Sequence, residues 1–461
     1  MGILDFLLAP VYLALIFYWA SNYIKSQGVE TQLQTYFIQG LALKFFCTLV
    51  FGLLYTYWWG NGTLGGDTSV YWRGGSHLFD LWLKDPSSAF FVLFSNFDDW
   101  RNNPYTFDFA DKLTAEVSRN FEGSLMMKIS GTIGLLTFNC YLITGFLFGL
   151  LAFLGQWKVF MTFRDKYPNI RKELAWGCLF LPDLTFWSSS IMKDTLCLGG
   201  ICLFYYGINN LYYGRKIVKS LLIVLINGWL VFVLKSYIIL AFMPAIFIWF
   251  YLSVLTKIKT LIFKIMTSVA LLFAVAAGGF IMLDKLAEMS EKYSIEKLQE
   301  TAEGFHSWHN YLAETGQVGS GYTLDFSDFS AMGMLKVAPA AINVTLFRPY
   351  IWETRNPVMF LSALQSLGML IFLLYISYKT GFAGMFRNFL VPDVALCMIF
   401  TIILSFACGI TAYNFGALVR FKIPMEPFFI SGLLIMYSRM LEQETKKRAA
   451  VASQKKVRVT V

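Results

Sequence analysis

The stretch IVKSLLIVLINGWLVFVLKSYIILAFMPAIFIWFYLSVL, residues 217–255, contains Lys219 and Lys235 as its only charged residues. A bilayer core about 30 Å thick requires about 20 apolar residues in each spanning helix. The stretch is long enough for two such helices, at 217–234 and 236–255, with Lys235 between them. It therefore predicts that the chain crosses a membrane by helices.

The composition of the whole chain agrees with this interpretation. Of 461 residues, 57% are hydrophobic and 15% are charged, whereas a soluble fold must cover its surface with charge. The net charge of +9 comes from basic residues in short loops between apolar runs. This is the positive-inside pattern of membrane proteins and not a nucleic-acid-binding surface. The cysteines lie inside apolar segments, where we expect them to pack and not to form disulfides or bind metal.

The same length rule predicts an all-α integral membrane protein with about eleven transmembrane helices. The first apolar run lacks a preceding basic stretch and a small-residue cleavage site, so we expect a retained helix and not a signal peptide. A further segment, 339–352, is a candidate re-entrant or interfacial element. The expected spans are 4–22, 35–59, 128–155, 174–190, 194–213, 217–234, 236–255, 265–283, 357–378, 391–411 and 423–439.

The distribution of lysine and arginine predicts the orientation. Four basic clusters, at 158–172, 215–219, 257–264 and 446–458, fall on the same side of the membrane, which must be the cytoplasm. The amino terminus then faces outward and the carboxyl terminus is cytoplasmic. Lys44 lies inside its span, and we expect its side chain to snorkel toward the cytoplasmic interface.

Two long loops, at 60–127 and 284–356, fall on the opposite, extracytoplasmic side. Both carry more acid than base over most of their length, and we expect short amphipathic helices in each, for example at 283–302. No internal repeat and no soluble domain is apparent. We therefore predict a single multispanning membrane domain over residues 1–461.

The motif GGDTSVYWRGG at 65–75 follows the second span. Its glycines let the backbone turn tightly and approach a ligand, while Asp67 presents a carboxylate at the membrane surface. Asp67 is a candidate general base or acceptor-binding group, with Tyr71 one helical turn later as a candidate substrate contact. The alternative is an interfacial turn in which Asp67 only caps a helix.

A second motif, LPDLTFWSSSIMKDT at 181–195, joins two predicted spans at the outer surface. Lys193 opposes the dipole at the start of a helix, which favours an anion nearby, although Asp194 could pair with it locally. Lys235 stands in a second tight outer turn. Two cations in such turns are typical of a phosphate site, with Trp187, Asp194 and Tyr237 as candidate substrate contacts.

A third motif, LFRPYIWETRNP at 346–357, lies where the second long loop returns to the membrane. Arginine forks bind phosphate or carboxylate in bidentate geometry, so Arg348 and Arg355 are candidate phosphate ligands. Trp352 and Glu353 are candidate substrate contacts, although Arg348 and Glu353 could simply pair with each other. Arg420, with Lys422, lies at the predicted outer end of the last span, against the positive-inside trend.

We predict no metal site. His306 and His309 have the spacing of a ligand pair but no obvious third ligand, although a divalent cation between Asp67 and a phosphate remains open. The chain lacks GxxxxGK[ST], GxGxxG, GxSxG and HExxH patterns, so nucleotide binding and serine or zinc hydrolysis are not expected.

Together these segments resemble bacterial multispanning envelope glycosyltransferases of the GT-C superfamily. The resemblance implies a seven-helix module at 35–283, a long outer loop at 284–356, and C-terminal helices with a basic cytoplasmic tail at 357–461. It implies that Asp67 is the catalytic base that deprotonates an acceptor hydroxyl. It also implies that the outer cations hold the phosphate of a polyprenyl-phosphate-linked sugar: Lys193, Lys235, Arg348, Arg355 and Arg420.

The expected function is sugar transfer from this lipid-linked donor to an envelope glycan, lipid or protein acceptor outside the bacterial cytoplasmic membrane. The nearest alternative is an O-antigen-type polysaccharide polymerase with a polyprenyl-pyrophosphate donor. A transporter of lipid-linked glycans would require charged residues deep within the bundle. A membrane subunit of a secretion complex would not require the outer cations.

Overall fold

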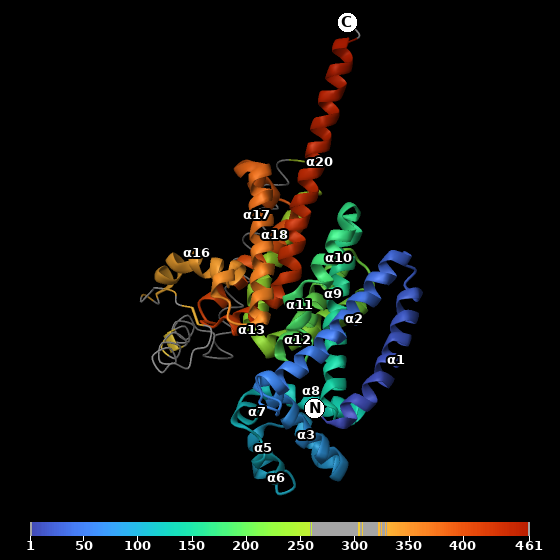
Figure 1. Cartoon of the computed structure of the whole chain (residues 1–461), viewed down its shortest axis with the longest axis vertical. Coiled ribbons are helices and arrows are strands. Elements are labelled where there is room, and N and C mark those ends of the chain that lie inside the picture. Colours follow the sequence, from blue (N-terminus) through green and yellow to red (C-terminus); the bar gives the residue numbers. More distant parts are fainter. Residues whose placement is uncertain are drawn as a thin grey trace. The chain divides into compact units, whose positions relative to one another are not determined.

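The computed structural model describes residues 2–258, a few positions between 260 and 330, and residues 331–459. The predicted span at 265–283, the amphipathic helix at 283–302 and the histidines at 306 and 309 lie outside the described residues. Within the described part the chain is helical (Figure 1), with an isolated bridge between Gly321 and Asn414. The predicted all-α class is confirmed.

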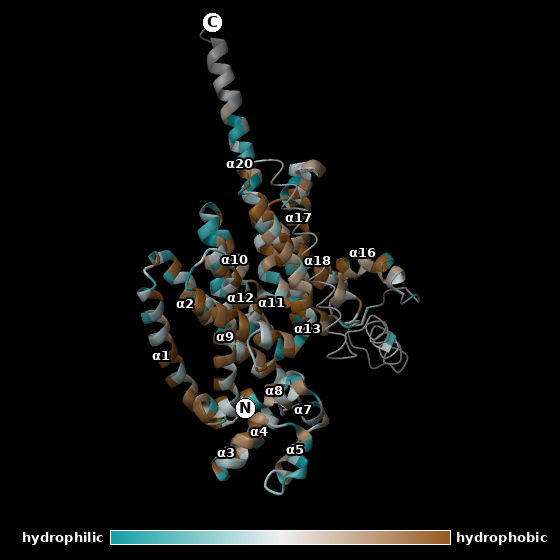
Figure 2. Cartoon of the chain, turned by 180° about the vertical axis from the view of Figure 1, so that it is seen from behind, coloured by the Kyte–Doolittle hydropathy of each residue, from teal (hydrophilic) through white to brown (hydrophobic). Residues whose placement is uncertain are grey.

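Six helices among the described residues are long and apolar enough to cross a membrane. Figure 2 shows the hydrophobic colours that dominate these helices. Their length and composition support the predicted membrane class. They are α1 (Ile3–Ser26), α2 (Thr31–Leu53) with its π-helical continuation η1 (Leu54–Trp58), α9 (Tyr141–Lys166), α13 (Ile217–Leu255), α17 (Pro357–Phe389) and α18 (Pro392–Gly409).

The prediction of a single helix at 128–155 is wrong. The structure has two helices there, α8 (Phe121–Thr137) and α9, because Phe138 and Asn139 adopt left-handed φ values of 51° and 53°. Asn139 also accepts a hydrogen bond from the Ser76 hydroxyl at 3.1 Å. Hydropathy does not register such a break, since the residues on both sides remain apolar.

The span predicted at 174–190 is also wrong. A 3-10 turn, η2 (Pro168–Ile170), leads into the short helices α10 (Arg171–Leu179) and α11 (Pro182–Phe186). Residues 187–192 are then non-helical up to α12 (Lys193–Tyr212). Pro182 occupies the first turn of α11, where its missing N–H costs no hydrogen bond.

Where the sequence predicted a tight turn between the spans 217–234 and 236–255, the structure has a kink at Lys235 inside α13. Lys235 has non-helical φ and ψ values of −153° and 78°, and the chain is helical on both sides of it.

The first long loop contains short helices, as predicted. They are α3 (Gly66–Lys84), α4 (Pro86–Phe94), α5 (Phe97–Asn102), α6 (Phe107–Asp111) and α7 (Ala115–Arg119). These helices, together with the start of α8, enclose a small apolar core whose largest buried member is Trp100. The loop is therefore a folded helical layer that positions α3.

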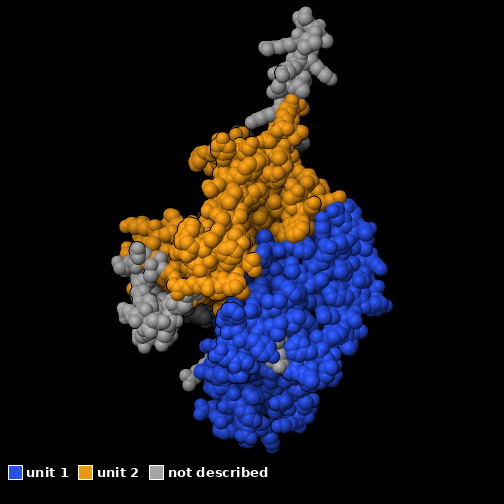
Figure 3. Space-filling model, in the orientation of Figure 1, with its two compact units in different colours: residues 1–162, 178–239 blue, residues 163–177, 240–461 orange. Residues whose placement is uncertain are grey.

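The chain divides into two compact units, coloured separately in Figure 3. Unit 1 comprises residues 1–162 and 178–239, and unit 2 comprises residues 163–177 and 240–461. Unit 2 also contains α16 (Ala331–Phe347), η4 (Ile351–Glu353), α19 (Phe415–Lys422), η5 (Ile423–Met425) and α20 (Glu426–Val459). The predicted site residues are divided between these units.

Candidate functional site

Asp67 lies in the first turn of α3, directly after the glycine pair. Gly66 has a φ of +65°, and a Cβ added there would meet the Tyr55 ring at 2.8 Å. Glycine adopts this backbone conformation without steric cost. The Gly65–Gly66 turn thus sets where α3 begins and holds the partly exposed Asp67 at that end.

A buried cluster of hydroxyl groups ties the start of α3 to the rest of unit 1. Thr68 Oγ1 lies 3.1 Å from the Tyr141 hydroxyl of α9 and 3.4 Å from Ser190 Oγ. Tyr141 and Ser190 are hydrogen bonded to each other at 2.7 Å. Because Ser190 belongs to the non-helical segment 187–192, the cluster holds that segment against α3 and α9.

Tyr71 is the centre of a group of charged side chains. It is 3% exposed, and its hydroxyl donates a hydrogen bond to Glu116 Oε1 at 3.0 Å. Lys193 Nζ lies 5.5 Å from the centroid of its ring. Burial, followed by the negative charges of Glu116, Asp67 and Asp194, raises the pKa of Tyr71 far above its ordinary value. The phenol therefore stays protonated and acts as a donor.

Asp194 forms an ion pair with Lys235, and both side chains are almost completely buried. The pair joins the start of α12 to the kink of α13. The alternative of a local pair between Lys193 and Asp194 is wrong, since Asp194 pairs with a lysine 41 residues away. Lys193 is partly exposed and forms no ion pair within the described part of the chain.

Trp187 and Tyr237 differ in their surroundings. Trp187 is buried and packs edge-on against Phe186 at 5.0 Å and Phe51 at 6.2 Å, so its ring contributes to packing between the 187–192 segment and α2. Tyr237 is partly exposed and lies just after the kink of α13.

In unit 2, Arg348 pairs with Glu353. The Arg348 Nε donates to both carboxylate oxygens at 3.0 Å, and its Nη2 also bonds to Oε1. The Tyr350 N–H donates to the same carboxylate at 2.7 Å. Although burial acts in the opposite direction, these hydrogen bonds hold the pKa of Glu353 below its ordinary value. The alternative of direct pairing between Arg348 and Glu353 is confirmed.

Aromatic rings surround the same guanidinium group. Its carbon lies 5.2 Å from the Phe415 ring centroid, 5.8 Å from Tyr350 and 5.9 Å from Tyr322. These distances are those of cation–π contacts. Arg348 therefore joins the turn after α16 to the start of α19.

The other site candidates of unit 2 are more dispersed. Trp352 is 81% exposed and stacks on Tyr350, with the ring centroids 4.9 Å apart. Arg355 is exposed, and Arg420 on α19 is partly exposed. Lys422, expected at an outer end, is buried instead. Its Nζ lies 3.7 Å from Glu426 Oε1.

Unit 1 brings together Asp67, Tyr71, Lys193, Asp194 and Lys235. Glu116 completes this group and was missed, because no local pattern marks an acid that bonds to a tyrosine 45 residues earlier. The predicted phosphate ligands Arg348, Arg355 and Arg420 belong to unit 2.

Sequence reasoning also missed the role of Lys44. Its side chain is completely buried and does not snorkel. Nζ donates to the Leu184 carbonyl at 3.2 Å and to Ser188 Oγ. The lysine thus holds α11 and the start of the 187–192 segment against α2. The position of Lys44 in an apolar run could have indicated such buried partners, since an intramembrane charge requires a partner.

Among the described residues, no group of three or more His, Cys, Asp or Glu side chains is arranged to hold a metal ion. Comparisons with protein-family models, with curated proteins and with solved structures found no match to this chain.

Proposed function

We propose that this protein is a membrane glycosyltransferase that moves a sugar from a polyprenyl-phosphate-linked donor to a glycan, lipid or protein acceptor. The observation that carries the proposal is the group around Tyr71, where a partly exposed carboxylate, Asp67, and a partly exposed cation, Lys193, lie in one unit at the starts of two helices. The proposal also includes a location in the bacterial cytoplasmic membrane, with about eleven spans and a GT-C-like fold. The site would lie on the extracytoplasmic face.

The chemistry requires a base and a stabilised leaving group. Asp67 accepts the proton of the acceptor hydroxyl while that oxygen forms a bond to the anomeric carbon of the sugar. The bond between the anomeric carbon and the phosphate oxygen breaks, and the phosphate of the lipid carrier takes the electron pair. Lys193 stabilises the negative charge that develops on this phosphate.

The surrounding contacts suit these roles. The ion pair between Asp194 and Lys235 satisfies both buried charges, which leaves Lys193 as the cation available for an anion. The Tyr71 ring restrains the Lys193 ammonium group from one side. Lys235 then acts by positioning the start of α12, and Glu116 by orienting Tyr71.

In unit 2, Arg355 and Arg420 remain candidate phosphate ligands, with Trp352 as a stacking surface for a sugar ring. Arg348 and Glu353 support this element by pairing with each other.

The proposal is tested by Asp67→Asn, assayed with a radiolabelled polyprenyl-phosphate sugar and membranes that hold the acceptor. We expect sugar transfer to fall by at least about 100-fold, because general base catalysis contributes factors of about 10² to 10⁴. Asp108→Asn removes an exposed carboxylate from the same loop and is the matched control. Unchanged transfer by Asp67→Asn would exclude the assigned base.

The donor site is tested in the same assay by Lys193→Gln. We expect a higher KM for the lipid-linked donor, since one charge-assisted contact to phosphate is lost. Lys112→Gln, which changes an exposed lysine in the 60–127 loop, should retain the parent value. Parallel assays with a pyrophosphate-linked donor distinguish transfer of single sugars from polymerisation.

Transport of lipid-linked glycans is a second candidate, favoured by charges inside the helices. Lys44 is completely buried on α2, and Lys422 and Glu426 form a buried pair. Proteoliposomes with a fluorescent lipid-linked sugar separate the two functions. Movement of the lipid across the bilayer without sugar transfer would favour transport.

A further inference from the structure

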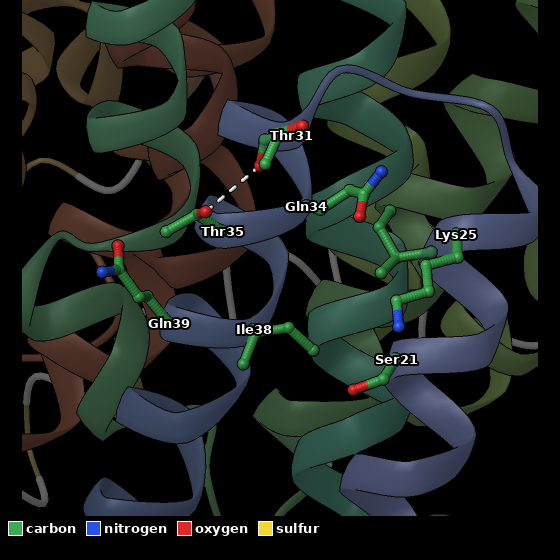
Figure 4. Close-up of a pocket in the computed structure, with 8 residues that line it drawn as sticks. Ser21, Lys25, Thr31, Gln34, Thr35, Ile38 and Gln39 are labelled. Carbon is green, nitrogen blue, oxygen red and sulfur yellow. Dashed lines mark hydrogen bonds between the residues drawn. The ribbon is translucent and has the colours of Figure 1, made fainter.

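A pocket of about 290 Å³ lies between α1 and α2, near the turn that joins them. Figure 4 shows Ser21 and Lys25 from α1, and Gln34 and Ile38 from α2, directed toward the space between the two helices. A water molecule in the liquid takes about 30 Å³, so the pocket has room for the headgroup of a phosphate ester.

The lining is unusual for two helices that are apolar enough to span a membrane. Polar side chains there require partners, because lipid tails offer none. Gln34 Nε2 donates to the Val29 carbonyl at 2.8 Å, and Thr35 Oγ1 donates to the Thr31 carbonyl at 3.1 Å, drawn as a dashed line in Figure 4. Lys25 forms no ion pair with any described residue.

The charge near the pocket is suited to an anion. Lys25 is the basic residue in the last turn of α1, and α2 has no acidic residue in its first turn. Glu30 directly precedes α2 but does not line the pocket. Lys158 of α9 supplies a further cation near the same end of α1, since its Nζ lies 5.7 Å from the Tyr23 ring.

An apolar stripe on α1 leads to Lys25. Leu7, Val11, Leu15 and Tyr18 recur at spacings of three or four residues, so they lie on one face of the helix. All four are more than half exposed. Lys25 lies on the same face, seven residues after Tyr18. A cation therefore stands at the end of the exposed apolar stripe.

We propose that this pocket binds the phosphate headgroup of an anionic phospholipid, with one acyl chain along the apolar stripe of α1. Lys25 contacts the phosphate, and the Ser21 hydroxyl donates a hydrogen bond to the headgroup. Free inorganic phosphate shares the headgroup chemistry but cannot use the stripe, which is why we assign a lipid. A basic pocket between spanning helices is the expected setting for such a headgroup.

The test uses the full chain in mild detergent, with bound lipid counted by native mass spectrometry during titration with phosphatidylglycerol or phosphatidylcholine. We expect preferential binding of phosphatidylglycerol by the parent protein. Lys25→Gln should weaken this binding about fivefold, since a lysine near an anionic lipid contributes about 1 kcal/mol. Ser21→Leu, which fills the pocket without a change of charge, should also weaken it.

Lys84→Gln is the matched control, because Lys84 is likewise an exposed lysine in the last turn of a helix, α3, but lies outside the pocket. Equal losses from Lys25→Gln and Lys84→Gln would overturn the proposal in favour of general surface charge. Displacement of the lipid by millimolar inorganic phosphate would overturn it in favour of a free phosphate site. Neither outcome bears on Asp67 or sugar transfer.

Discussion

The hydroxyl of Tyr71 is buried next to the Glu116 carboxylate, while the Lys193 ammonium group lies against its ring. A phenol in this setting is held protonated, because burial and nearby negative charge both disfavour the phenolate. Tyr71 therefore orients charged neighbours and does not itself exchange a proton near neutral pH. The chemistry of the group belongs to Asp67 and Lys193.

At the same scale, we expect the Glu353 carboxylate to stabilise the folded protein at neutral pH and to lose this effect in acid. Its pKa is lower in the folded protein than in the unfolded chain, where it is about 4.3. Its stabilising effect is thus fully present above that unfolded value, and is lost as the pH falls through the folded pKa. Thermal unfolding of the parent and of Glu353→Gln should therefore differ near pH 7 and converge as the pH falls below the pKa of Glu353 in the folded protein.

Glu444→Gln is the control for this measurement, because Glu444 lies 3.8 Å from Lys379 in a more exposed pair. Surface pairs contribute little, so its melting temperature should stay close to that of the parent at all pH values. A Glu353→Gln protein as stable as the parent near pH 7 would contradict the assigned pairing.

At the scale of elements, the position of α3 depends on close packing against α8. A Cβ added to Gly75 would lie 2.8 Å from the Gly131 backbone nitrogen, and one added to Gly131 would lie 2.7 Å from the Gly75 carbonyl oxygen. The two helices can approach this closely only where both lack a side chain. Their contact, together with the Thr68 hydroxyl cluster, sets the direction in which Asp67 is presented.

Gly75→Ala should therefore destabilise the protein by about 1 to 3 kcal/mol, the usual cost of overpacking, as measured by denaturant unfolding in detergent micelles. Gly368→Ala is the control, because Gly368 lies within α17 and its added Cβ would meet no atom within 4 Å. Alanine there should be neutral or stabilising. Equal unfolding free energies for the two variants would show that α3 and α8 separate at little cost.

At the scale of the whole molecule, the proposed mechanism requires the start of α3 to lie across the membrane from the basic tail. We expect Asn61→Cys to react with a membrane-impermeant maleimide in intact cells, and Arg448→Cys to react only after permeabilisation. Asn61 and Arg448 are both exposed, whereas the seven native cysteines are buried, so the background should be low. Reaction of position 61 solely from the inside would exclude an extracytoplasmic site.

Several features could be predicted from the sequence because they depend on neighbouring residues. The long apolar runs specify membrane helices, since the transfer free energy of a segment is a sum over its own side chains. The glycines before Asp67 specify a turn and a helix start, and Arg348 with Glu353, five residues apart, can pair within one turn. The interruption at Lys235 follows from a charge between two apolar halves.

Other features were decided by tertiary structure. Glu116 reaches Tyr71, Lys235 reaches Asp194, and Lys44 bonds to Ser188 144 residues later. No local pattern specifies such partners, because a buried polar group takes whichever complementary group the packing of distant helices brings within hydrogen-bond distance. Composition thus determined that the chain forms helices apolar enough to cross a membrane. Helix packing determined which charges meet, since pairing energies exist only after the helices have come together.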